Sequence, residues 1–82
     1  MSYEKVAQAK AIVIGTKQTL KALKEKQAQE VILASDTDYQ LIRLIKAKAN
    51  ELNVSVTEVD SMKKLGKACG IEVSAATVAI IK

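Results

Sequence analysis

The sequence predicts an α/β fold in which a sheet is sandwiched between helices. Short apolar runs alternate along the chain with segments whose apolar residues recur at helical spacing, the pattern of helices packed on a sheet. No proline, repeat, low-complexity tract or linker separates these segments, so they follow one another almost without loops. With 82 residues, we expect a single domain over 1–82 that buries a core without disulfides or metal.

The first two predicted elements are short. Residues 2–10 (SYEKVAQAK) are expected to form a helix with Val6, Ala7 and the pair at 9–10 near its buried side. Residues 11–14 (AIVI) are apolar throughout and predict a short strand. A glycine follows directly, and glycine lets a chain turn tightly from a strand into the next element.

The second helix and a central strand come next. We predict a surface helix over 15–26, opened by Gly15, because Leu20 and Leu23 are separated by lysines. Residues 31–34 (VILA) form an uninterrupted apolar run, as expected for a central strand that is covered on both faces.

The third helix is expected to follow residues 35–38 (SDTD). These residues supply a cap, and acids early in a helix suit its dipole. The apolar residues after the cap recur at helical spacing and are expected to face inward: Leu41, Ile42, Ile45, Ala49 and Leu52. Three basic residues are expected on the outside: Arg43, Lys46 and Lys48.

A strand, a helix and a strand complete the prediction. Valines at positions 54, 56 and 59 mark the third strand, with polar residues between them. Ser61 is expected to cap a helix that runs through Lys63 to Cys69 and ends at Gly70, a typical left-handed stop. Residues 76–81 (ATVAII) are the final strand.

Two features of the composition exclude most catalytic chemistry. The chain has no histidine, which excludes imidazole acid–base catalysis, histidine-activated nucleophiles and histidine metal ligands. A lone Cys69 supplies neither a zinc site nor an internal disulfide, and it fits a reducing compartment. We therefore expect no enzyme activity, no metal and no cofactor.

The hydropathy pattern predicts neither membrane association nor export. No apolar run approaches the roughly 20 residues that cross a bilayer. Residues 1–5 lack the apolar segment of a signal peptide. We expect a cytoplasmic protein that is a monomer and has no membrane partner.

Positive charge is concentrated in two stretches of the chain. The formal net charge is +4, and seven of the 13 basic residues lie in these stretches. They are Lys17, Lys21, Lys24 and Lys26 in the first and Lys63, Lys64 and Lys67 in the second. If the two stretches meet in space, they form a basic edge suited to nucleic acid. The aromatic fraction of 2% is too low for the stacking platforms that bind single-stranded RNA, but binding of a structured RNA by lysines does not need them.

The start of the second predicted helix combines a glycine with lysines on one face. Lys17, Lys21 and Lys24 are spaced by four and three residues. The first turn of a helix has free N–H groups and a positive dipole end, so it suits an anion. On spacing alone, simpler structural interpretations stay open. Gly15 could serve only as a tight turn, and Lys21 and Lys24 could be ordinary solvated lysines.

Three segments together resemble one protein family. They are IGTKQTLKALK, the strand VILA with the acidic turn after it, and KKLGKACGIEVSAATVAII. The chain is similar, over essentially its whole length, to the kink-turn RNA-binding ribosomal-protein family of the L-seven-Ae and L-thirty-e type, and within it to small bacterial members of the YbxF type. The resemblance implies a three-layer α/β/α sandwich with a mixed four-stranded sheet. It also implies binding to kink-turns, RNA duplexes bent sharply at a bulge that is flanked by tandem sheared G·A pairs.

The resemblance further implies which residues contact RNA. Lys17 and Gln18 take the positions that read the G·A pairs, with Lys21 one turn later. Many archaeal members have asparagine and glutamate in place of Lys17 and Gln18, whereas the Lys–Gln pair matches the L-thirty-e branch and the bacterial members. The loop at 71–73 takes the place of the loop that packs apolar side chains against the looped-out nucleotide. The predicted RNA-binding residues are Gly15, Thr16, Lys17, Gln18, Lys21, Lys63, Ile71, Glu72 and Val73.

Alternatives remain for the second motif and for the function. Ile71 and Val73 could instead be core residues of an entering strand, and Glu72 is interpreted as a loop-orienting residue or a base-edge acceptor because it would repel phosphate. We expect a partner RNA that contains a kink-turn, with ribosomal RNA among the candidates. One alternative is a phosphate- or nucleotide-binding domain, but the sequence has no Walker pattern and no dinucleotide glycine pattern. The other alternative is a protein-interaction scaffold.

Overall fold

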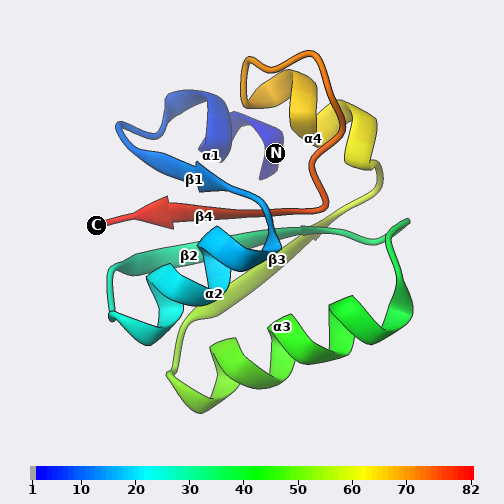
Figure 1. Ribbon diagram of the computed structural model, residues 1–82. Helices are drawn as coiled ribbons and strands as arrows, with labels where there is room; N and C mark the ends of the chain where they lie inside the picture. Colours follow the sequence, from blue (N-terminus) through cyan, green and yellow to red (C-terminus); the bar gives the residue numbers. More distant parts are fainter. Residues whose placement is uncertain (1) are drawn as a thin grey trace.

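The chain is built in three layers, with helices on both faces of a four-stranded sheet (Figure 1). The computed structural model describes residues 2–82. The elements alternate in the order α1 (Ser2–Gln8), β1 (Ile12–Ile14), α2 (Thr16–Lys24), β2 (Ala28–Ala34), α3 (Tyr39–Glu51), β3 (Ser55–Val59), α4 (Met62–Ala68) and β4 (Thr77–Ile81). Helices α2 and α3 cover one face of the sheet, and α1 and α4 cover the other. The predicted α/β/α sandwich is confirmed.

The sheet is mixed, in the strand order β1-β4-β2-β3. Strands β2 and β3 are parallel, whereas β4 is antiparallel to both of its neighbours, β1 and β2. Strands β1, β2 and β3 therefore run in one direction and finish at the same end of the sheet, where β4 begins. We call this end the carboxyl end of the sheet. The segments that leave β1, β2 and β3 and the loop that enters β4 all meet there (Figure 1).

Strand β2 is the centre of two apolar clusters. Val31 and Leu33 pack with α2 and α3, and Ile32 and Ala34 pack with α1 and α4. All four side chains are fully buried. This confirms the prediction of a central strand covered on both faces, and the uninterrupted apolar run is its cause, because successive side chains of a strand point to opposite faces.

Strand β2 begins three residues earlier than its apolar run indicates. It starts at Ala28, which is buried, and continues through the polar residues Gln29 and Glu30. The register with β4 shifts between Ala28 and Glu30, as in a β-bulge. The Glu30 carboxylate is paired with the Lys5 ammonium at 3.1 Å, so a polar residue is accommodated within the strand. The predicted start was wrong because these polar residues concealed the extension.

Helix α1 is shorter and buries less than predicted. It ends at Gln8, and Val6 is its fully buried apolar residue. Ala9, just beyond the helix, packs against the same apolar cluster, whereas Ala7 and Lys10 are exposed. The predicted buried side was therefore right at Val6 and Ala9 and wrong at Ala7 and Lys10. The reason is geometric, since a two-turn helix lying on a sheet presents only a narrow face to it.

The predicted helix ends are confirmed by their hydrogen bonds. Asp38 caps α3, and its side chain accepts a hydrogen bond from the N–H of Gln40 at 2.9 Å. Ser61 caps α4, and its hydroxyl accepts from the N–H of Lys64 at 3.2 Å. Gly70 has a φ of 79°, the left-handed conformation expected at a helix stop.

Candidate nucleic-acid interface

The carboxyl end of the sheet brings together two segments that are distant in sequence. The N–H of Gly15 donates to the carbonyl of Thr77 at 2.8 Å, which ties the start of α2 to the first residue of β4. The predicted RNA-binding segment at 15–21 follows β1 directly, and the one at 71–73 lies in the loop that leads into β4. Both motifs therefore lie at this end of the molecule (Figure 1).

Gly15 opens α2 in a conformation that favours glycine. Its φ is 108° and its carbonyl accepts from the N–H of Thr19 at 2.9 Å. A Cβ at this position would meet no atom within 4 Å, so glycine is required for its backbone conformation and not for space. No side chain caps this helix, which leaves the first-turn N–H groups, beginning at Thr16, available to an anion.

The predicted base-reading residues share one exposed surface of α2. Lys17, Gln18 and Lys21 are exposed and together line one side of a groove between α2 and α3. Thr19 points to the other side of the helix and is fully buried. Within residues 2–82, no carboxylate pairs with the ammonium group of Lys17 or Lys21. No ion pair among the described residues therefore offsets their positive charge.

The loop before β4 runs directly against α4 at a glycine. A Cβ on Gly66 would lie 2.0 Å from the carbonyl oxygen of Val73 and 3.2 Å from the Cα of Ser74. The N–H of Ile71 donates to the carbonyl of Gly66 at 3.1 Å. The path of the loop at 71–74 therefore depends on the absence of a side chain at position 66. No pattern in the sequence predicts this contact, because Gly66 meets a loop that has no periodicity.

A second set of contacts ties this loop to its neighbours through Met62. The N–H of Ala75 donates to the carbonyl of Met62 at 3.0 Å. The N–H of Met62 donates to the side chain of Asp36, in the loop after β2, at 2.9 Å. Three segments at the carboxyl end of the sheet are thus linked through the first residue of α4.

The three predicted residues of the loop differ in exposure. Ile71 is half-buried and packs against the apolar cluster beneath α1 and α4. Val73 is 70% exposed, an unusual position for a large apolar side chain, and Glu72 is exposed beside it. The alternative reading of both apolar residues as core residues of a strand therefore fits Ile71 in part and fails for Val73, because β4 begins only at Thr77.

Lys63 is separated from the lysines of α2 by the sheet. It is the second residue of α4, is exposed, and stands near the carboxyl end. Helices α4 and α2 lie in opposite layers, with the sheet between them (Figure 1). Lys64 is also paired with Asp60 at 3.4 Å. The two lysine stretches, expected to form a basic edge if they met in space, therefore belong to helices on opposite faces of the sheet.

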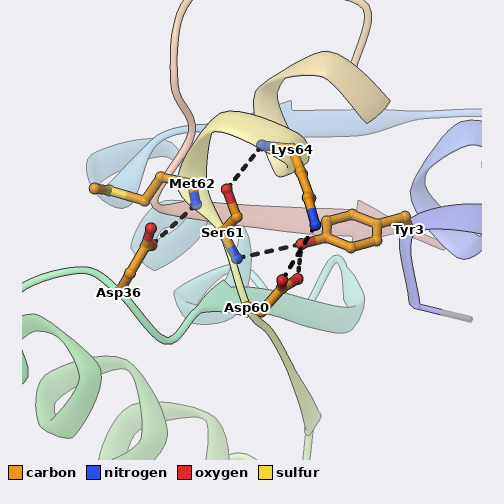
Figure 2. Close-up of polar contacts among 6 residues, drawn as sticks. All are labelled: Tyr3, Asp36, Asp60, Ser61, Met62 and Lys64. Atoms are coloured by element: carbon orange, nitrogen blue, oxygen red, sulfur yellow. Dashed lines mark hydrogen bonds and ion pairs between the residues drawn. The ribbon is translucent and has the colours of Figure 1, made fainter.

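Figure 2 shows a polar network at the start of α4 that the sequence did not reveal. The Tyr3 hydroxyl donates to a carboxylate oxygen of Asp60 and accepts from the N–H of Ser61 at 3.2 Å. The other carboxylate oxygen of Asp60 faces the Lys64 ammonium. The network joins α1 to the turn that opens α4. It left no signal in the sequence, because Tyr3 is 57 residues from Asp60.

We predict that this network makes the folded state sensitive to acid. The hydrogen bond from Tyr3 is the main cause that lowers the pKa of Asp60, and Lys64 adds to it. Aspartate in an unfolded chain has a pKa of about 3.9, so the contribution to stability is complete above that pH and is lost as the pH falls from there through the folded pKa. Replacing Tyr3 with phenylalanine should return the Asp60 pKa toward its ordinary value, as measured by NMR titration of the carboxylate. Identical titration curves for Asp60 in the two proteins would contradict the assignment.

The described residues also bear on metal binding, thiol reactivity and membrane crossing. Within residues 2–82, no group of three or more histidine, cysteine, aspartate or glutamate side chains is placed to hold a metal ion. Cys69 is half-buried, and burial raises the pKa of its thiol, which disfavours the reactive thiolate. In the same part of the chain, none of the helices has the length and apolar character needed to cross a membrane.

Comparisons with known proteins agree with this arrangement. The family model described as the ribosomal protein L7Ae/L30e/S12e/Gadd45 family matches residues 2–82. The RNA-binding protein YbxF of Geobacillus stearothermophilus is 66% identical over 82 residues, with 100% of both chains covered. The RNA-binding protein SaurJH9_0567 of Staphylococcus aureus is 42% identical, also with 100% of both chains covered.

A solved structure has the same fold. The 15.5kD RNA binding protein of Giardia lamblia matches with a TM-score of 0.86 at 26% sequence identity. The match covers 98% of the present chain and 68% of the Giardia chain. The arrangement of layers and strands is therefore shared with a protein that has a much more distant sequence.

Proposed function

Because the chain belongs to the ribosomal protein L7Ae/L30e/S12e/Gadd45 family, we propose that it binds RNA, recognises kink-turns and stabilises their bent form. One observation carries the proposal. The carboxyl end of the sheet holds both the uncapped, lysine-bearing start of α2 and an exposed apolar side chain, Val73, in the loop before β4. The full-length relatives that are named as RNA-binding proteins support the general function.

The start of α2 suits the edges of G·A pairs. Guanine presents O6 and N7 as adjacent acceptors, and the Lys17 ammonium can donate to both. Gln18 has an acceptor and two donors, so it can meet adenine or guanine edges where a carboxylate could only accept. The major groove of a regular A-form duplex is too deep and narrow for side chains, so α2 can read base edges only where the duplex is bent or opened. The backbone N–H of Thr16 would contact phosphate. The N–H of Gly15, also expected to do so, instead donates to the carbonyl of Thr77.

The loop before β4 would hold the looped-out nucleotide. Val73 is exposed and supplies an apolar surface for the face of a base, while Ile71 anchors the loop to the core. An apolar contact does not distinguish bases by hydrogen bonds, so this part of the site would accept different nucleotides. Glu72 is exposed between Ile71 and Val73, and it would orient the loop or accept a hydrogen bond from a base edge.

Binding of the bent form alone would shift the population of the RNA. Free kink-turns exchange between open and folded shapes, and a protein that binds one of them moves the equilibrium toward it by its difference in affinity. We propose that the chain acts as a cytoplasmic monomer, by binding and without catalysis, with ribosomal RNA among its candidate targets. Lys63, at the start of α4, stays a predicted RNA-binding residue.

A gel shift tests the proposed function directly. One RNA contains a kink-turn and the other has the tandem G·A pairs replaced by Watson–Crick pairs, with length and salt concentration held equal. We expect the replaced RNA to bind more than about tenfold more weakly, since each wrong base pair costs about 1–3 kcal/mol in comparable interfaces. Equal affinity for the two RNAs would reduce the interaction to attraction between charges and would overturn the proposal.

A further inference from the structure

The groove between α2 and α3 extends beyond the residues that the family resemblance assigns to RNA. It has a volume of about 550 Å³. Lys17 and Lys21 line one part of it, and the groove continues past them to Lys24 at the end of α2 and to Lys48 on α3. Lys24 was predicted to share one face with Lys17 and Lys21, with an ordinary solvated position as the alternative, and Lys48 was predicted on the outside of α3. Neither is among the predicted RNA-binding residues.

The charge of the groove is positive along its length. Lys17 and Lys24 are seven residues apart, or about 10 Å along the helix axis at about 1.5 Å per residue. Within residues 2–82, no carboxylate pairs with Lys24, and Lys48 has only an exposed contact with Glu51 at 3.7 Å. Exposed ion pairs of this kind contribute little, so Lys48 remains able to contact an anion. The groove is thus a row of donors suited to a chain of phosphates.

Two apolar side chains also line the groove. Leu20 lies between the lysines of α2, and Leu44 of α3 is 52% exposed. Leu44 was not among the residues predicted to face inward, and it is exposed in the structure. Apolar side chains flanked by lysines can contact the sugars of a strand whose phosphates lie on the ammonium groups. Protein–protein interfaces are depleted in lysine, so a groove with four lysines favours RNA over a protein partner.

We propose that this groove holds the sugar-phosphate backbone of the RNA stem that continues beyond the G·A pairs, with Lys24 and Lys48 as phosphate contacts. The proposal rests on the proposed function, because Lys17 and Lys21 place the G·A pairs at one end of the groove. The contacts do not read sequence. Their effect depends on the length of the stem, since a stem that ends at the G·A pairs does not reach Lys24 or Lys48.

Binding of two kink-turn RNAs tests the proposal. They share the kink and differ only in the stem on the α2 side, which is long in one and ends at the G·A pairs in the other. The variants are Lys24→Ala with Lys48→Ala together, and Lys24→Glu. Lys10→Ala is the matched control, because Lys10 is an exposed lysine before β1 that does not line the groove. Circular dichroism and thermal unfolding establish that each variant is folded.

We expect the double variant to bind the long-stem RNA about 20-fold more weakly at about 0.15 M salt, with the slope of log K against log salt reduced by about two. Lys24→Glu should also weaken this complex, while Lys10→Ala should not. Affinity for the short-stem RNA should be unchanged in all variants. An equal loss of affinity for both RNAs would overturn the proposal. No loss of affinity for either RNA would also overturn it, and would favour a protein partner for the groove.

The failure of this proposal is distinguishable from failure of the proposed function. If the wild-type protein prefers the kink-turn over the RNA without G·A pairs but the variants behave like wild type, only the groove assignment is wrong. If the wild-type protein shows no such preference, the proposed function is wrong, whatever the stem length does.

Discussion

Replacement of Gly66 by alanine is expected to displace the loop at 71–74 and to abolish tight kink-turn binding. The added Cβ would lie 2.0 Å from the carbonyl oxygen of Val73 and 3.1 Å from its carbonyl carbon. These are backbone atoms, which cannot rotate away as a flexible side chain can. Gly66 is itself buried in α4, so either the loop or the helix must move. Overpacking of this kind costs about 1–3 kcal/mol of stability or more.

A second glycine offers a matched control for this experiment. Gly70 has a φ of 79°, and a Cβ there would meet nothing within 4 Å. Gly70→Ala should therefore lower the free energy of unfolding by about 1–2 kcal/mol, because alanine disfavours the left-handed conformation. It should not displace the loop. Urea unfolding measures both costs, and amide chemical shifts of residues 71–75 report the loop. Unchanged shifts and unchanged RNA affinity in Gly66→Ala would show that the close approach to Val73 is not required.

Replacement of Lys17 or Lys21 by alanine is expected to weaken kink-turn binding in two distinguishable ways. Lys17 is proposed to donate to a guanine edge. Its loss should weaken the binding free energy by about 1–3 kcal/mol and reduce the preference for RNA that contains G·A pairs. Lys21 is proposed to contact a base edge or the neighbouring phosphate. Its loss should cost about fivefold near 0.15 M salt, and the loss should become smaller at high salt.

Titrations at several salt concentrations measure both effects. Both side chains are exposed and lack an ion pair within the described residues, so neither substitution should lower the unfolding temperature by more than a few degrees. Lys10→Ala again serves as the control for the loss of one charge. If Lys17→Ala and Lys21→Ala fold normally and bind the kink-turn like wild type, the assignment of the site to the start of α2 is wrong.

Local patterns in the sequence were sufficient to predict most of the fold. The apolar run at 31–34 predicted the strand buried on both faces, and the side chains of Asp38 and Ser61 cap the helices as expected. In each case the signal and its consequence lie within a few residues of each other. The start of β2 was not predictable in this way, because Glu30 is accommodated by Lys5, a residue far away in the sequence.

The site was predicted less completely than the fold. The surface of α2 follows from helical spacing, and the structure shows Lys17, Gln18 and Lys21 exposed together. The different exposure of Ile71 and Val73 could not be predicted, because a loop has no period from which to assign inner and outer residues. The role of Gly66 in holding that loop was also missed, since it depends on a contact between a helix and a loop that the chain reaches later.

The sequence by itself determined which elements form, in which order, and which lysines share one face at the start of α2. These properties depend on side-chain periodicity, caps and glycines, which act over a few residues. Only the tertiary structure decided that the start of α2 and the loop with Val73 share one end of the sheet, and that the lysines of α2 and α4 lie in opposite layers. Both outcomes depend on strand order and on the face that each helix covers, and these are set by packing between segments that no local pattern connects.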